Sequence, residues 1–217
     1  MGILKYSGIF GLTVFTLFIF LSFLVAEDLF TAFDFNTTVK IQDFLPERVV
    51  GLFSSFSLLG SAEVASVILL LTLFIFKLPR KIIVLVFYCL TGVIELAGKI
   101  MIEHNGPPVL FLKTKLAVHF PTAYIPHEFF SYPSGHSART AFVSLVLMIA
   151  IWISPKLSKN LKIIFIFGVL AFDFVMYLSR VYLGEHWTTD VMGGILLGTS
   201  LALLYFAVGN FNLRPKK

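Results

Sequence analysis

Six long apolar runs are the feature of this sequence that most restricts its fold. A helix needs about 20 residues to cross the hydrocarbon core of a bilayer, and the runs approach that length. They predict membrane-spanning helices at residues 9–26, 63–76, 82–102, 134–153, 163–178 and 188–208. The chain is 58% hydrophobic and only 13% charged, whereas a soluble domain is about 25% charged. We therefore expect an all-α, polytopic membrane protein in which residues 1–217 form a single domain, a bundle of six transmembrane helices.

The first apolar run can also be interpreted as a secretory signal peptide. The run is longer than a usual signal-peptide core, and acidic Glu27 and Asp28 follow it where a cleavage site would have small residues. We therefore expect it to be retained as the first span. After it, we expect residues 27–48 to form a loop, with a short interfacial helix around residues 44–56.

The basic residues lie in short clusters at the ends of the apolar runs. Although the formal net charge is +5, this distribution is typical of a membrane protein and not of a nucleic-acid-binding surface. In a six-span chain, more than half of the 17 Lys and Arg fall on one side, namely Lys5, Lys77, Arg80, Lys81, Lys156, Lys159, Lys162, Arg214, Lys216 and Lys217. The positive-inside rule predicts that both termini are cytoplasmic and that the polar connectors lie outside. The size of the chain favours a bacterial plasma membrane.

Ionisable residues are concentrated at the outer ends of the predicted spans. Such residues cost a few kcal/mol each in a bilayer unless they are paired or line a polar cavity, so they are candidates for function. They are Lys99, His136, Arg139, Arg180, Glu185, His186 and Asp190. Two histidines among three cations indicate an anion site with acid–base capacity. The only cysteine, Cys89, lies in an apolar run, so a cysteine metal site is excluded and a transition-metal site is disfavoured.

One part of the predicted anion site is the segment Pro133-Ser134-Gly135-His136, at the start of the fourth span. Serine is a favourable N-cap, and glycine lets a ligand approach the backbone. Free amides and the helix dipole at such a terminus favour a bound phosphate. His136 would lie beside that phosphate, where it could donate a proton to a departing oxygen.

A second part lies around the start of the sixth span. His186 and Asp190 are four residues apart, so they share one helix face if the helix begins near His186. The carboxylate could then hold one imidazole nitrogen and leave the other free to attack. Arg180 comes just before, where its guanidinium could bind two phosphate oxygens at once.

Together, the two segments resemble the signature of the type 2 phosphatidic acid phosphatase family, which shares its site with the vanadium haloperoxidases. The matching residues are Pro133-Ser134-Gly135-His136 and then Ser179-Arg180, five residues, His186, three residues and Asp190. The resemblance covers about residues 99–204. It implies a six-span helical bundle and a phosphatase that acts on lipid phosphates.

The resemblance also implies a role for each residue. His186 would be the nucleophile that forms a phosphohistidine, Asp190 would orient it, and His136 would be the general acid. The remaining residues would bind the phosphate oxygens, with no metal and no cofactor, namely Lys99, Ser134, Gly135 and Arg180. The substrate would be a phosphomonoester or pyrophosphate of a lipid, such as undecaprenyl pyrophosphate, phosphatidylglycerophosphate or phosphatidate.

The sequence departs from the family pattern at one position. The first family motif is a lysine, six further residues, and then arginine and proline, but Lys99 is followed at that distance by Gly106 and Pro107. Arg139 lies one helical turn beyond His136, and we expect it to supply the missing charge. Weaker candidates are His104, Lys113 and Lys115.

Two other functions share most of these features. A lipid phosphotransferase would pass the phosphate from His186 to an acceptor lipid, and nothing in the sequence separates it from a phosphatase. A non-catalytic lipid-phosphate binder or transporter is favoured only by the missing arginine. A haloperoxidase is disfavoured because those enzymes are soluble.

Overall fold

The computed structural model describes residues 6–114 and 130–209, and within these ranges it contains helices and loops but no strand. The α-helices are α2 (Ser7–Ala26), α3 (Thr31–Phe44), α4 (Val50–Ser57), α5 (Ala62–Ile75), α6 (Lys81–Met101), α7 (Gly135–Ile153), α8 (Lys159–Tyr182) and α9 (Thr188–Val208). Three short 3-10 helices connect them, namely η1 (Glu47–Val49), η2 (Leu58–Gly60) and η3 (Val109–Phe111). The all-α prediction is confirmed.

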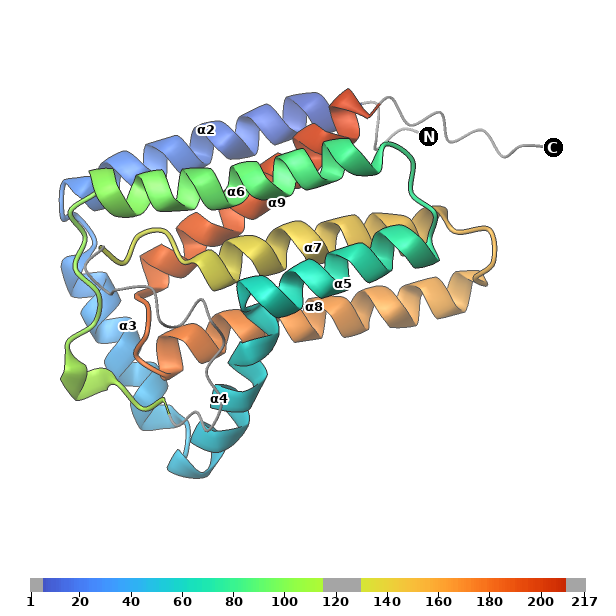
Figure 1. Ribbon diagram of the computed structural model, residues 1–217. Coiled ribbons are helices and arrows are strands. Elements are labelled where there is room, and N and C mark those ends of the chain that lie inside the picture. Colours follow the sequence, from blue (N-terminus) through green and yellow to red (C-terminus); the bar gives the residue numbers. More distant parts are fainter. Residues whose placement is uncertain (1–5, 115–129, 210–217) are drawn as a thin grey trace.

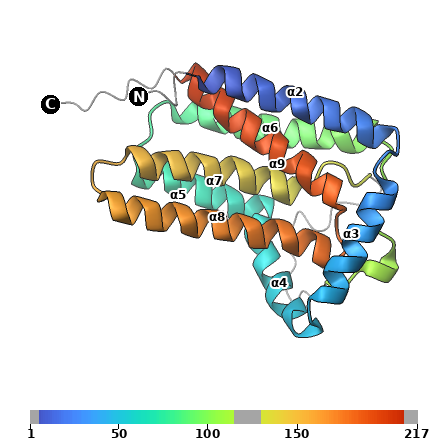
Figure 2. The ribbon, with the colours of Figure 1, turned by 180° about the vertical axis from the view of Figure 1, so that it is seen from behind.

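Helices α2, α5, α6, α7, α8 and α9 run alongside one another, and α3 and α4 project from one end of this bundle (Figures 1 and 2). Five of the six are long and apolar enough to cross a membrane, and α5 is the exception. Residues 47–60 and 62–75 pass the same test only as a pair, bent by 57°. The predicted six-helix bundle is therefore present, and the chain is an integral membrane protein whose second span is short and broken.

Helix α9 has its most extensive contacts with α2 and α7, and two glycines let it approach α7 closely. A Cβ atom at Gly194 would overlap the carbonyl oxygen of Ser134, and one at Gly198 would overlap that of Ala138. Small residues permit such close approach of helix backbones in membranes. As a result the first turns of α7 and α9 touch, and the Ser134 N–H donates to the Asp190 carbonyl at 2.9 Å.

The helix ends that carry the predicted site meet at one end of the bundle. The carboxyl ends of α6 and α8 and the amino ends of α7 and α9 lie there, beside α3 (Figure 1). Ser134 caps α7, because its Oγ accepts a hydrogen bond from the Ser137 N–H at 3.4 Å. The helix N-terminus that we expect to bind phosphate is therefore a defined structural element.

Residues 27–48 are not a loop, and that prediction is wrong for α3. The face of α3 that packs on the protein is polar, since Asp34 and Thr38, one turn apart, are 1% and 0% exposed. The apolar Phe33 and Phe35 of the same helix are about half exposed. A helix with its polar side inward lacks the apolar stripe by which an amphipathic helix is recognised. The expected interfacial helix near residues 44–56 corresponds to α4.

The fifth span is longer than its apolar run. Helix α8 begins at Lys159, after the cap Ser158, and ends at Tyr182. Arg180 therefore belongs to the last turn of α8 and not to the link that follows. Other predictions fall outside the described residues, namely those for Lys5, Arg214, Lys216 and Lys217, and for residues 115–129 of the connector between the third and fourth spans, which include Lys115.

Candidate active site

His186 and Asp190 face each other at the junction of α8 and α9, as their spacing predicts. His186 Nδ1 lies 3.4 Å from Asp190 Oδ2, and Asp190 is completely buried. The Ser131 hydroxyl donates to the same Oδ2 at 2.5 Å and lies 3.1 Å from His186 Nδ1. The backbone N–H of Trp187 also donates to Oδ2, at 2.8 Å. The Ser131 hydroxyl and the Trp187 N–H therefore hold one oxygen of the Asp190 carboxylate in front of the His186 imidazole.

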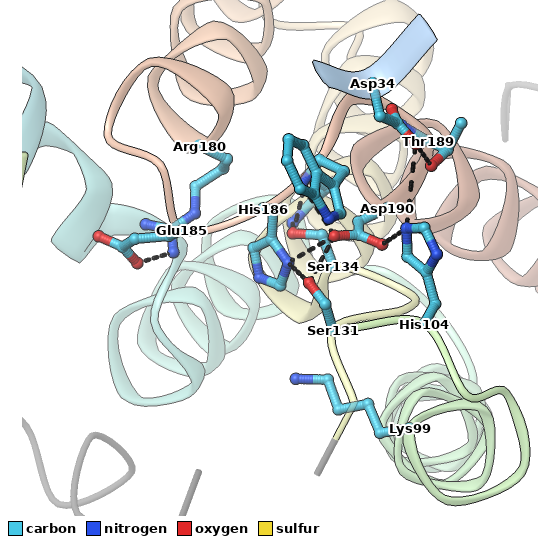
Figure 3. Close-up of polar contacts among 12 residues, drawn as sticks. Asp34, Lys99, His104, Ser131, Ser134, Arg180, Glu185, His186, Thr189 and Asp190 are labelled. Carbon is cyan, nitrogen blue, oxygen red and sulfur yellow. Dashed lines mark hydrogen bonds and ion pairs between the residues drawn. The ribbon is translucent and has the colours of Figure 1, made fainter. Parts of the chain in front are cut away.

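These contacts determine which ring nitrogen of His186 carries the hydrogen. The Ser131 hydroxyl hydrogen points to Asp190, so its oxygen can accept a hydrogen bond only from a protonated Nδ1. Nε2 then carries the lone pair and points away from the carboxylate (Figure 3). Burial lowers the pKa of His186 below its ordinary value of 6.5, against the opposing effect of Asp190. The residue is thus neutral at pH 7, with a free nitrogen suited to nucleophilic attack.

Arg180 reaches this junction from the last turn of α8 and is 2% exposed. Its Nη2 pairs with the Glu185 carboxylate, whereas its Nε and Nη1 are buried without a hydrogen-bond partner among the described residues. Buried donors of this kind are rare without a ligand or water. Burial opposes ionisation of Glu185, but Arg180 and a 2.5 Å hydrogen bond from Thr114 together hold the pKa of Glu185 below its usual value. Arg180 therefore offers two free N–H donors beside an ionised partner.

Lys99 and Arg139, both predicted to bind phosphate, contact a single carboxylate. Lys99 Nζ is 3.4 Å from Glu95 Oε1, and Arg139 Nη1 donates to Glu95 Oε2 at 2.8 Å. That carboxylate lies directly against Gly135, where a Cβ atom would overlap it. An anion thus already occupies the space between two cations and the N-terminus of α7. Glu95 therefore pairs with both of these cations.

His136 lies in the first turn of α7 and is partly buried. Its imidazole is close to Gly60, where a Cβ atom would come within 3.0 Å of the ring. The ring interacts electrostatically with the surrounding site residues, namely Lys99, Arg139, Arg180 and His186. All the predicted site residues therefore come from helix ends or links at one end of the bundle.

Two residues of the site were not predicted from the sequence. Ser131 contacts both members of the His186–Asp190 pair, and its only sequence signal is its position two residues before Pro133. Asp34 lies on α3 and accepts hydrogen bonds from the backbone N–H of Thr189 at 2.9 Å and from its hydroxyl at 2.5 Å. Its sequence signal would have been the four-residue spacing of the polar residues on α3.

His104, suggested as a substitute for the missing arginine, lies elsewhere in the site. Its Nε2 is 3.5 Å from Asp190 Oδ1 and 3.9 Å from Asp34 Oδ2, so it faces two carboxylates and not the predicted phosphate position. In the described parts of the chain, no group of three or more His, Cys, Asp or Glu is arranged to hold a metal ion.

Residues 80–214, more than half of the chain, match the model of the PAP2 superfamily. The chain is 42% identical over 90 residues to phosphatidylglycerophosphatase B of Bacillus subtilis. It is 32% identical over 134 residues to undecaprenyl-diphosphatase of Sulfolobus acidocaldarius. These alignments cover 41% and 61% of this chain but 42% and 57% of the relatives. The chain thus spans about half the length of the curated relatives that it matches.

Two crystal structures share the fold. A transmembrane PAP2-type phosphatidylglycerolphosphate phosphatase from Bacillus subtilis has a TM-score of 0.71, with 90% of this chain and 93% of that chain covered at 22% identity. Aquifex aeolicus LpxE has a TM-score of 0.59, with 80% and 94% covered, also at 22% identity. The family match, the shared fold and the paired histidine and carboxylate agree, and this chain belongs to the PAP2 superfamily.

Proposed function

We propose that the protein is a membrane phosphatase that removes phosphate from a lipid phosphate through a phosphohistidine on His186. The observation that carries the proposal is the arrangement of His186, whose Nδ1 faces a buried carboxylate while Nε2 is free. The names of the two curated relatives, a phosphatidylglycerophosphatase and an undecaprenyl-diphosphatase, support the same chemistry.

In the proposed reaction, the phosphate binds between Arg180, Lys99 and the N-terminus of α7. His186 Nε2 attacks phosphorus, and the bond from phosphorus to the lipid oxygen breaks. His136 donates a proton to that leaving oxygen. A water molecule then attacks the phosphohistidine and gives a proton to His136, and the bond between phosphorus and Nε2 breaks, which releases inorganic phosphate and regenerates neutral His186. Cations aimed at the phosphoryl oxygens stabilise the charge that develops in both steps.

A bound phosphate would take over the partners of two carboxylates. Glu95 now contacts Lys99 and Arg139, and Glu185 contacts Arg180. A phosphate group carries more charge than a carboxylate and offers more acceptor oxygens. It would therefore compete well for the same cations. In the structure, the charges of the three cations are balanced by the carboxylates of Glu95 and Glu185.

The substrate is expected to be a lipid phosphate at the outer face of a bacterial plasma membrane. The site lies at one end of a bundle of apolar helices, where a headgroup would meet the protein while its chains stay in the bilayer. The loops at the opposite end join α5 to α6 and α7 to α8 (Figure 1), and they carry a cluster of cations, namely Lys77, Arg80, Lys81 and Lys156. By the positive-inside rule, this distribution supports a cytoplasmic position for that end.

The proposal is tested by phosphate release from purified protein in detergent with EDTA. The lipids are undecaprenyl pyrophosphate, phosphatidylglycerophosphate and phosphatidate, without an acceptor lipid. Wild type is compared with His186→Ala and with Asp173→Asn, a change at a buried carboxylate in α8 that accepts a hydrogen bond from Ser144. We expect release by wild type and Asp173→Asn, and none by His186→Ala.

Three results would contradict the proposal. Lipid binding by a folded wild type without any release would favour a non-catalytic binder, which the glycine at position 106 already suggests. Release that remains in His186→Ala would exclude His186 as the nucleophile. Phosphate transfer that occurs only when an acceptor lipid is added would identify a phosphotransferase.

A further inference from the structure

His104 lies on the opposite side of the Asp190 carboxylate from His186 (Figure 3). It follows α6 in the chain, between the Lys99 and Gly106 positions of the first family motif, and is 6% exposed. Its Nε2 is 3.5 Å from Asp190 Oδ1. The four side chains His186, Asp190, His104 and Asp34 therefore form a row in which imidazole and carboxylate groups alternate.

The two oxygens of Asp190 have different surroundings. Oδ2 is contacted by Ser131, by the Trp187 N–H and by His186. Oδ1 is buried and makes no hydrogen bond with the described residues, and the same is true of His104 Nε2 opposite it. A buried carboxylate oxygen without a donor is costly. Hydrogen bonds of a catalytic site are often long without substrate and shorten in the complex. A contraction of a few tenths of an ångström would satisfy both orphan atoms.

Asp34 also approaches His104, at the same Nε2 atom that faces Asp190. Its carboxylate is 3.9 Å from His104 Nε2 and accepts two hydrogen bonds from Thr189, the residue before Asp190. Burial raises the pKa of Asp34, against the effects of Thr189 and His104. Helix α3 thus contributes a carboxylate that contacts both the first turn of α9 and the imidazole beside Asp190.

We propose that His104, which lies beside Asp34, is a positioning residue that donates its Nε2 hydrogen to Asp190 Oδ1 and keeps that carboxylate aligned with His186. The role rests on the phosphohistidine function proposed above. His104 touches neither the substrate nor the reacting nitrogen, and acts only through Asp190. Without its donor, Oδ1 is left unsatisfied, the carboxylate is no longer held on that side, and His186 loses its orienting partner.

The test measures phosphate release as a function of pH for wild type, His104→Leu, His104→Gln and Asp34→Asn. Glutamine retains an N–H donor near the Nε2 position, whereas leucine fills similar space without one. Gln42→Leu is the matched control on α3, since Gln42 donates to the carbonyl oxygens of Phe111 and Tyr182 and not to the row. Thermal unfolding of each variant in detergent measures the folded fraction.

We expect His104→Leu to lower kcat about 10- to 100-fold with KM nearly unchanged, as found when partners of a catalytic group are removed. Attack requires a neutral His186, and Asp190 raises the pKa of that imidazole, so a misaligned Asp190 should shift the fall of kcat/KM on the acid side to lower pH. The charged and titratable groups that face His186 are Asp190, Arg180, Lys99, His136 and Glu185. His104→Gln should recover most of kcat and the wild-type pH profile, and Asp34→Asn should lie between them.

A His104→Leu protein with wild-type kcat and pH profile would overturn the inference. So would a loss of activity that His104→Gln does not recover, or one that merely follows the folded fraction as in Gln42→Leu. The failure of the proposed function is a different result, because wild type itself would then release no phosphate, and the inference would fall with it.

Discussion

The two sides of the candidate site are built differently. On the side of the nucleophile, His186, Asp190 and Ser131 are buried and hydrogen-bonded to one another in the ligand-free protein. On the side of the phosphate, the cations are paired with carboxylates, Lys99 and Arg139 with Glu95 and Arg180 with Glu185. The residues proposed for nucleophilic attack are already hydrogen-bonded to one another, whereas the cations proposed to bind phosphate are paired with carboxylates of the protein.

This difference follows from what each side has to do. A nucleophile gains from fixed geometry, because orientation in advance removes an entropic cost from the reaction. A cluster of cations cannot stay unpaired in a membrane protein, because isolated buried charges are costly. Internal carboxylates pair with these cations, and under the proposed function a bound phosphate displaces the carboxylates. Substitutions on the first side should therefore change kcat, and those on the second should also change KM.

The largest effect is expected for Asp190→Asn. The amide keeps the shape of the carboxylate but cannot hold His186 in its Nδ1-protonated form, so we expect kcat to fall about 10³- to 10⁴-fold with KM nearly unchanged. The measurement is steady-state phosphate release. Asp173→Asn makes the same chemical change at a buried carboxylate away from the site. If Asp190→Asn lost no more activity than this control, the nucleophile side would not depend on the carboxylate.

A smaller effect is expected for Arg180→Lys on the phosphate side. Lysine keeps the charge but loses the planar donors that Arg180 leaves unpartnered, so we expect kcat/KM to fall about 100-fold. Arg80→Lys is the matched control, because Arg80 donates to the Val208 carbonyl at the other end of the bundle. Equal kinetics for Arg180→Lys and wild type would show that charge alone is needed there.

Arg139→Ala should have a moderate effect and should be rescued at another position. Arg139 is 17% exposed and already paired with Glu95, so we expect its removal to lower kcat/KM only about 10-fold. A Cβ atom at Gly106 would lie 3.5 Å from Ser131, in ordinary contact. Gly106→Arg added to Arg139→Ala should therefore restore activity. Activity comparable to wild type in Arg139→Ala alone would exclude its proposed role.

The smallest effect is expected for Glu95→Gln, and its direction is opposite. Without the carboxylate charge, Lys99 and Arg139 are freed for the substrate, so we expect KM to fall about fivefold with little change in kcat. Lipid titrations at fixed pH measure this change. Glu103→Gln, at an exposed carboxylate in the segment after α6, should leave KM unchanged. An increase of KM in Glu95→Gln would show that Glu95 supports phosphate binding and does not compete with it.

The parts of the fold that a membrane dictates could be predicted. The fourth and sixth spans were predicted within one residue of α7 and α9, since a run of apolar residues in a bilayer has few alternatives to a helix. Helix α3 was missed because its buried face is polar. The second span was predicted at residues 63–76, which corresponds to α5, and Ser61 caps the start of that helix. The 57° bend between α5 and residues 47–60 was not predicted.

The sequence by itself determined the local geometry of the site. The four-residue spacing predicted that His186 and Asp190 lie near each other, although α9 begins only at Thr188 and His186 lies in the link before it. Ser134 marked the start of α7, because an N-cap depends on contacts within a single helical turn. Only the tertiary structure decided which distant residues join them. Asp34, His104 and Ser131 meet at Asp190, and Glu95 meets Arg139, because α3, α6, α7 and α9 pack together at one end. Such contacts depend on the crossing and rotation of whole helices, which no local spacing specifies.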